Sequence, residues 1–148
     1  MENKVDESYV SFELAQLAKA NGFNWLTNKF YYETDSIYAK KGSIGTGYDS
    51  DYWGNTTLYD WNEYGVPFKP FGEAASCMLL STLQKWLRDE YNIHVWIVPA
   101  TDSTFRAWVT NDLRLDLINS MSCNATLTYE ESLELGLRKA IKKYKNVR

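Results

Sequence analysis

Apolar residues recur at helical spacing in three separate stretches of the chain. The first stretch covers residues 11–21, where Ser11 is a favourable N-cap and Gly22 can form a left-handed C-cap. The second covers residues 73–91, and the third begins near residue 128. The apolar stripe of the second stretch consists of Ser76, Leu79, Leu80, Leu83, Trp86 and Leu87. The pattern therefore predicts three helices.

The third predicted helix has the clearest start signal. Thr128 and Glu131 have the spacing of a capping box, in which each side chain binds the backbone N–H of the other residue. Gly136 then interrupts the apolar stripe, although Gly costs about 1 kcal/mol relative to Ala inside a helix. We therefore expect a neighbouring element to pack close to Gly136.

Shorter runs rich in β-branched and aromatic residues predict two antiparallel hairpins. The first pairs residues 30–32 with 37–39 across a turn at 33–36. The second pairs residues 93–98 with 105–110 across the turn Thr101-Asp102-Ser103. Residues 57–61 are a further candidate strand, and residues 113–121 fit either a helical turn or a strand.

This order of elements favours an α+β fold, a small antiparallel sheet of hairpins with three helices packed on one face. A chain of 148 residues has the size of one domain, so we expect residues 1–148 to form a single domain. Residues 1–8 are expected to be a disordered N-terminus. Residues 42–72, here called the aromatic segment, are expected to be a loop-rich, acidic insertion that Pro67 and Pro70 close.

Charge and hydropathy argue against nucleic-acid binding and against membrane association. The formal net charge of −3 gives no overall attraction to nucleic acid or to an anionic membrane. Residues 1–7 contain no apolar segment of the signal-peptide type, and no run reaches the roughly 18 apolar residues of a membrane span. These features predict a cytoplasmic protein without membrane contact.

Three stretches resemble the motifs of a known family. Residues 83–95 contain LQKWLR-x-x-x-NIHV, residues 128–137 contain TYEE-x-LE-x-GL, and residues 10–23 have a similar opening that ends at Gly22 and Phe23. In this order the motifs are similar to those of small uncharacterised proteins of gut Bacteroidetes and their bacteriophages, including the crAss-like group. The resemblance implies a phage or prophage setting and a scaffold of capped helices, and it supplies no catalytic residues. The family opens its second helix with an Ala-Pro-Thr-Gln segment that is absent at the aligned residues 77–80.

The aromatic segment is the first candidate binding surface. Between Gly42 and Phe68 there is no Lys or Arg, whereas four acidic residues lie among many Tyr and Trp side chains. Exposed aromatic rings beside carboxylates can form a partner interface or a stacking platform. The candidate residues are Tyr52, Trp53, Tyr59, Trp61 and Tyr64. The alternative is that these rings fold back onto the domain.

The second hairpin carries the other candidate surface. Alternation of side chains places four residues on one face, here called the tryptophan face: His94, Trp96, Arg106 and Trp108. Two Trp rings beside Arg can stack on a base or another planar ligand. The alternative is a Trp pair buried beneath the aromatic segment, and a slip of one residue in register would scatter the group.

Catalytic and metal chemistry find little support in the sequence. His94 is the only histidine, and Cys77 and Cys123 lie far apart without metal-ligand spacing. Cys77 and His94 could form a nucleophile–base pair, but no third residue is evident to orient them. We therefore expect no enzyme activity, no metal and no cofactor.

The sequence thus favours a small non-enzymatic accessory protein of phage type that binds a protein partner or a second copy of itself. The partner would be a host factor or a virion component. One alternative is a protein that sequesters a nucleotide or another small molecule between its Trp rings. Another is nucleic-acid binding through residues 138–148, which hold six basic residues and no acidic one. The net charge disfavours nucleic acid, and the same basic residues would stabilise a helix C-terminus.

Overall fold

The computed structural model describes residues 8–35, 39–46, 58–65, 73–111 and 121–144. Along the chain the elements are α1 (Phe12–Ala20), β1 (Lys29–Tyr32), β2 (Ile44–Thr46), α2 (Trp61–Tyr64), β3 (Ala74–Cys77), α3 (Leu80–Tyr91), β4 (His94–Pro99), a 3-10 turn η1 (Thr101–Ser103), β5 (Phe105–Thr110), β6 (Met121–Ser122) and α4 (Tyr129–Tyr144).

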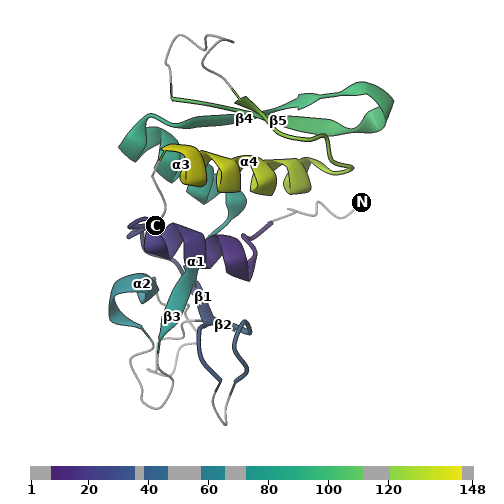
Figure 1. Ribbon diagram of the computed structural model, residues 1–148. Coiled ribbons are helices and arrows are strands. Elements are labelled where there is room, and N and C mark those ends of the chain that lie inside the picture. Colours follow the sequence, from purple (N-terminus) through teal and green to yellow (C-terminus); the bar gives the residue numbers. More distant parts are fainter. Residues whose placement is uncertain (1–7, 36–38, 47–57, 66–72, 112–120, 145–148) are drawn as a thin grey trace, which may run out of the picture.

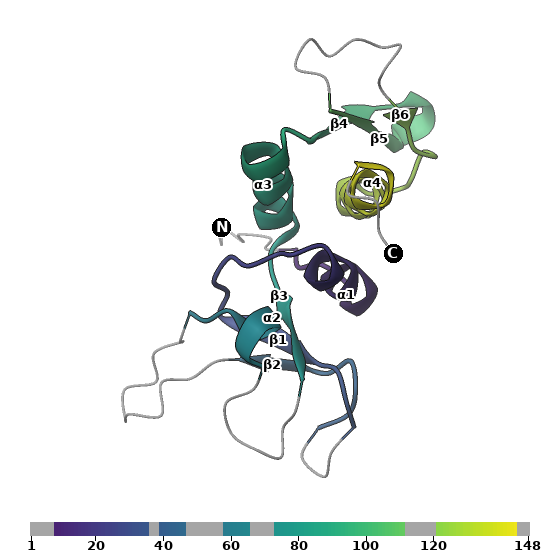
Figure 2. The ribbon, with the colours of Figure 1, turned by 60° about the vertical axis from the view of Figure 1, so that its left-hand side comes forward.

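Two antiparallel sheets lie at opposite ends of the molecule, and helices α1, α3 and α4 lie between them (Figures 1 and 2). The strand orders are β2-β1-β3 and β4-β5-β6. Helix α4 contacts β4 and β5 on one side and α1 and α3 on another, so one apolar core runs from sheet to sheet. The predicted α+β class is confirmed. The strands form two small sheets and not the single sheet that was predicted, and the helices lie between them (Figure 1).

The first predicted hairpin has a different partner strand. Strand β1 pairs on one side with β2, so residues 44–46 supply a return strand, and on the other side with β3. Residues 36–38 lie outside the described residues, and Ala39 belongs to no strand. The ring of Phe30 lies directly over Gly45, where any Cβ atom would collide with it. This close contact explains why a glycine stands in so short a strand.

Residues 74–77 form strand β3, so the prediction that one helix covers 73–91 is wrong in its first third. All four residues are buried, because α1 covers one face of β3 and α2 lies against the other. Ala75 and Cys77 join the main core, and Ala74 packs in a second cluster with Phe30 and Trp61. A run buried on both faces has no alternation, and its small side chains resemble a helix in the sequence.

The aromatic segment contains regular structure as well as loop. Tyr59 makes an isolated bridge with Thr27, but the predicted strand at 57–61 is wrong, since helix α2 starts at Trp61. Asp60 caps that helix through a hydrogen bond that its carboxylate accepts from the N–H of Glu63. With β2 also inside it, the described part of residues 42–72 is more than an inserted loop.

Two further predicted segments, residues 1–8 and 113–121, lie mostly outside the described residues. Residues 1–7 lie outside the described residues, but the carbonyl of Ser8 accepts a hydrogen bond from the N–H of Leu80 at 2.9 Å. Ser8 is therefore part of the fold and not of a disordered N-terminus. Residues 112–120 also lie outside the described residues, and Met121 begins strand β6.

The second hairpin and the last helix are confirmed. Strands β4 and β5 pair antiparallel with Trp96 opposite Trp108. The hydroxyl of Thr128 accepts a hydrogen bond from the N–H of Glu131 at 3.1 Å, as the capping signal predicts. Helix α1 has Ser11 as its N-cap, with the hydroxyl accepting from the N–H of Leu14 at 3.2 Å.

The expected close neighbour of Gly136 is the inner face of the β4–β5 hairpin. A Cβ atom on Gly136 would lie 2.7 Å from the Cβ of Ala107 and 2.8 Å from a methyl group of Val95. Both distances are far below ordinary van der Waals contact. The absent side chain of Gly136 therefore sets how closely α4 approaches the hairpin.

We expect Gly136→Ala to lower the free energy of unfolding by about 1–3 kcal/mol, the usual cost of overpacking a core. The cost should appear even though Ala has the higher helix propensity, by about 1 kcal/mol. Urea unfolding followed by circular dichroism measures the change. The double variant Gly136→Ala/Ala107→Gly removes one of the two colliding atoms and should recover part of the loss. A single variant that is more stable than the parent would contradict the close contact.

Candidate binding surface

The β4–β5 hairpin separates a buried face from an accessible one. Val95, Ala107 and Val109 are buried on the side of α4. The opposite face carries the cross-strand pairs Trp96 with Trp108 and Val98 with Arg106, and at one end His94 with Thr110, of which Thr110 is buried. The structure therefore brings together the four residues of the tryptophan face, as the alternation predicted.

The two tryptophan rings form the centre of this face. Their centroids lie 6.3 Å apart and their planes differ by 18°, and each side chain is half-buried. A planar ligand held between two rings needs about 7 Å, twice the contact distance of carbon atoms. The rings as they stand are too close for that, so a ligand or a partner would lie against the pair and not between its members. Arg106 is exposed beside them.

His94 is fixed at the beginning of β4. Its Nε2 atom lies 2.9 Å from the side-chain oxygen of Asn92. Asn92 ends α3 in the left-handed conformation (φ 56°), which Asn tolerates better than most residues. The short connection through Asn92 places the imidazole between the tryptophan face and helix α3.

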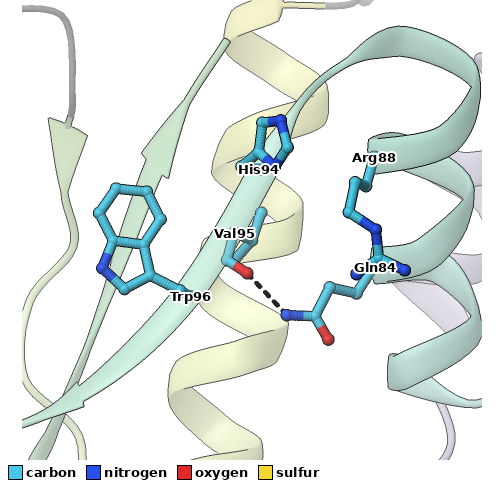
Figure 3. A pocket seen from close by; sticks show the side chains of 5 residues that line it. All are labelled: Gln84, Arg88, His94, Val95 and Trp96. Carbon is cyan, nitrogen blue, oxygen red and sulfur yellow. Dashed lines mark hydrogen bonds between the residues drawn. The ribbon is translucent and has the colours of Figure 1, made fainter. Parts of the chain in front are cut away.

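A cleft of about 180 Å³ lies between α3 and β4, beside the tryptophan face (Figure 3). It is lined by Gln84, Arg88, His94, Val95 and Trp96. The side-chain amide of Gln84 spans the cleft and donates a hydrogen bond to the carbonyl of Val95 at 2.6 Å. The ring of Trp96 points to the other side of β4, away from α3 (Figure 3).

Gln84 and Arg88 were missed as site residues by the sequence analysis. Their polar spacing on α3 predicts a solvated helix face, and in the structure Arg88 is exposed whereas Gln84 is half-buried. Only the tight turn at Asn92, which brings β4 back along α3, turns that face into one wall of a cleft. The short interval between the helix and strand motifs is the one signal in the sequence that points to this arrangement.

The candidate residues of the aromatic segment do not form one surface. Tyr52 and Trp53 lie outside the described residues. Trp61 is 4% exposed, and its indole N–H donates to the carbonyl of Thr27 at 2.8 Å. Trp61 thus follows the alternative in which the ring folds back onto the domain, where it fills the second apolar cluster.

Tyr59 and Tyr64 stay closer to the surface than Trp61. Tyr59 is half-buried and packs against Trp61 with ring centroids 4.9 Å apart. Tyr64 lies 5.4 Å from Tyr59 by the same measure and is 64% exposed. Within the described part of this segment, Tyr64 is the aromatic ring that a partner could reach most easily.

The structure separates Cys77 from His94, which lie in different sheets. Burial raises the pKa of the Cys77 thiol to about 11, against the partial effect of a hydrogen bond with Tyr31. Burial and the neighbouring Cys77 raise the pKa of the Tyr31 hydroxyl, which donates to the carbonyl of Val10 at 2.6 Å. A protonated, buried thiol is a poor nucleophile. The two residues do not form a nucleophile–base pair.

Two further searches cover the described residues alone. In that part of the chain, no group of three or more His, Cys, Asp or Glu side chains is placed to hold a metal ion. Nor does any helix there have both the length and the apolar character needed to cross a membrane.

No family model, no curated protein and no solved structure shows a significant match to this chain. The fold and the surface together define it as an α+β protein in which two antiparallel sheets enclose three helices and one sheet presents a pair of stacked tryptophans.

Chemical labelling of the two buried thiols directly tests how the structure places them. A rise in the pKa of Cys77 from 9.0 to about 11 lowers its thiolate fraction at pH 8 about 100-fold. We expect iodoacetamide at pH 8 to label Cys77 at least about 100-fold more slowly in the native protein than in the urea-unfolded protein, and burial, which also raises the pKa of Cys123, to slow the labelling of Cys123. Intact-mass spectrometry over time measures both rates. Rapid labelling of the native protein that peptide mapping locates at Cys77 would show that the Cys77 environment is described wrongly.

Proposed function

We propose that the protein is a non-enzymatic binding protein that contacts a protein partner through the tryptophan face. The observation that carries this proposal is the stacked pair of Trp96 and Trp108 outside the core, with Arg106 exposed beside it. Trp and Arg are the residues most enriched among those that dominate binding energy in interfaces.

The packing of α4 behind the tryptophan face favours a binding role. Helix α4 packs against the inner side of both strands, and the absence of a side chain at Gly136 lets the helix backbone lie close against Val95 and Ala107. A surface held in one conformation loses less entropy when a partner binds. Two large rings on a rigid backing therefore suit a specific contact.

The resemblance to phage proteins supplies the proposed setting. In that setting the protein acts in the cytoplasm of a bacterial host as a phage accessory protein. Its partner is a host factor or a component of the virion. A catalytic role is not part of the proposal, because the Cys77 thiol is buried and lies in a different sheet from His94.

A small molecule is the second candidate ligand. The cleft beside Trp96 favours it, with the amide of Gln84 and the guanidinium of Arg88 as polar groups. However, the volume of about 180 Å³ is below the 300–1,000 Å³ that is usual for ligand pockets. The spacing of the Trp rings also argues against a planar ligand held between them. The cleft therefore ranks behind the tryptophan face as the principal site.

Nucleic acid ranks third. Lys139 donates to the carbonyl of Ser122 at 3.1 Å, and Arg138 lies 3.5 Å from the carboxylate of Glu134. Lys142 and Lys143 are exposed in the last turn of α4, where cations favour the helix dipole. The basic residues that the structure describes in this region thus already have structural roles.

The proposal predicts that truncating the tryptophan pair removes partner binding. We would place a photo-cross-linking residue at Arg106 and expose the protein to a lysate of a Bacteroidetes host. The expected result is one dominant cross-linked product that Trp96→Ala or Trp108→Ala reduces about 30-fold, because truncating a central interface residue costs about 2 kcal/mol or more.

Tyr64→Ala is the matched control, since it removes an exposed aromatic ring from helix α2, which packs against the other sheet. It should leave the cross-linked product unchanged. If Tyr64→Ala abolished the product and Trp108→Ala did not, the aromatic segment would be the contact surface and the proposal would fail. A small mass retained in native mass spectrometry and lost in Arg88→Ala would favour the cleft instead.

A further inference from the structure

The outer edge of strand β4 faces helix α3, and hydrogen bonds elsewhere in the sheet show which backbone groups lie at that edge. Phe105 of β5 bonds Thr126 with both its N–H and its carbonyl, on the side of β6. Backbone groups alternate in direction along a strand, so the even-numbered residues of β5 bond the even-numbered residues of β4. Val95 lies between two of these residues. Its N–H and its carbonyl therefore both point toward α3.

The two outward groups of Val95 differ in their hydrogen bonding. The carbonyl accepts from the side-chain amide of Gln84 at 2.6 Å. The N–H makes no hydrogen bond with any residue that the structure describes, although Val95 is buried. Buried backbone N–H groups without a partner are rare, because such a group loses water without gaining another acceptor. Since Val95 lines the cleft between α3 and β4, an acceptor that enters the cleft would satisfy this N–H.

Helix α3 contributes further donors to the same cleft (Figure 3). The guanidinium of Arg88 donates from its Nε atom to Asp89 at 3.3 Å, and no described residue accepts from its two terminal nitrogens. The side-chain nitrogen of Gln84 donates one N–H to Val95 and carries a second. Of the described residues that line the cleft, none is Asp or Glu. The cleft therefore offers hydrogen-bond donors and one positive charge.

The C-terminus of α3 does not strongly oppose a negative charge in the cleft. The last carbonyls of a helix carry partial negative charge, which disfavours anions nearby. In α3, however, the carbonyl of Leu87 accepts from the N–H of Ile93 and that of Arg88 from the N–H of Asn92, both at 3.1 Å. The effect of a helix dipole on a charge is also weaker than a hydrogen bond between two charged groups. The donors of the cleft thus outweigh the helix end.

A carboxylate matches these donors in shape and charge. Its two oxygens accept parallel N–H groups from a guanidinium, and its remaining lone pairs can accept from the N–H of Val95. One carboxylate balances the single charge of Arg88, whereas a phosphate group would bring about two negative charges. The volume of about 180 Å³ is too small for a drug-sized ligand, and it suits one side chain or one chain end.

We propose that the cleft binds a carboxylate of the protein partner, held by the guanidinium of Arg88 and the N–H of Val95. This inference rests on the proposed function, because the partner is the one that contacts the tryptophan face. Trp96 belongs to that face and also lines the cleft, so one partner can reach both. The carboxylate is that of an Asp or Glu side chain or of the partner's C-terminus. A charged contact beside an aromatic centre fixes the orientation of the partner.

Asp89 limits the strength of this contact. Its carboxylate accepts from the Nε atom of Arg88 and also from the ammonium group of Lys85. Both ion pairs are exposed, where such pairs contribute little, and 3.3 Å is long for a hydrogen bond. Asp89 thus neutralises part of the charge of Arg88 and leaves the terminal nitrogens available. Removing the charge of Asp89 should therefore strengthen carboxylate binding.

An NMR titration of backbone amides with short peptides tests the cleft itself. The probes are acetyl-Leu-Ala with a free carboxyl end, acetyl-Leu-Asp-amide with a side-chain carboxylate, and acetyl-Leu-Ala-amide with neither. We expect a carboxylate probe, and not the neutral one, to move the N–H signal of Val95 downfield until it saturates. Comparing the first two probes decides between a chain end and a side chain as the source. Equal shifts with the neutral probe would overturn the proposal.

Three variants show which residues hold the probe. Arg88→Gln should weaken binding at least about tenfold, because hydrogen bonds between charged groups are lost. Asp89→Asn should strengthen it. Trp108→Ala is the matched control and should leave the affinity unchanged, since Trp108 is not among the described residues that line the cleft. An affinity in Arg88→Gln equal to that of the parent would contradict the proposed role of Arg88.

The cross-linked partner shows whether the cleft belongs to the proposed interface. With the photo-cross-linking residue at Arg106, Arg88→Gln should reduce the product at least about tenfold and Asp89→Asn should not reduce it. If Trp108→Ala abolished the product and Arg88→Gln left it unchanged, the proposed function would stand and the carboxylate contact would fail. If the peptides bound but no Trp108-dependent product formed, the cleft would serve a free carboxylate, and both the proposed function and its assignment to a partner would fail.

Discussion

The contact between Gly136 and the β4–β5 hairpin is the constraint on which the rest of the structure depends. Without a side chain at Gly136, α4 approaches the hairpin until its backbone lies against Val95 and Ala107. This approach buries the inner face of both strands. Because side chains alternate along a strand, burying Val95 and Ala107 sends Trp96 and Trp108 to the opposite face. The position of the tryptophan face is thus a consequence of how the core closes behind it.

The same helix also joins the two halves of the molecule. Helix α4 contacts α1 and α3, and α1 in turn covers β3 of the other sheet. The core is therefore continuous from one sheet to the other, while each sheet keeps one side away from it. In the β1–β3 sheet that side is covered by α2 and Trp61, so it is structural. In the β4–β6 sheet it carries the tryptophan face, where Trp96 and Trp108 are only half-buried and Arg106 is exposed.

Local signals were enough to predict the elements that follow one another closely. The caps at Ser11 and Thr128, and the alternation along both strands of the second hairpin, each lie within a short segment. Strand β3 and helix α2 could not be predicted in this way. Residues 74–77 become a strand because they pair with β1, far away in the chain, and their small side chains carry no alternation.

In the candidate site, too, local features were predicted and features that depend on long-range packing were not. The tryptophan face followed from alternation and a correct register, both local properties. The burial of Trp61 and the exposure of Tyr64 depend on where α2 packs, and the sequence left both alternatives open. Gln84 and Arg88 belong to the site only because the turn at Asn92 brings β4 back along α3.

Nuclear Overhauser effects in solution test the central claim most directly. The non-hydrogen-bonded pairs Val95 with Val109 and Ile97 with Ala107 should give strong contacts between Hα protons, since their Cα atoms lie about 4.5 Å apart. The Hα protons of Gly136 should also show contacts to the methyl groups of Val95. Strong Hα contacts between Trp96 and a residue of β5 would instead show a register shifted by one residue. In that case the two tryptophans would not share a face, and the account of the binding surface would be wrong.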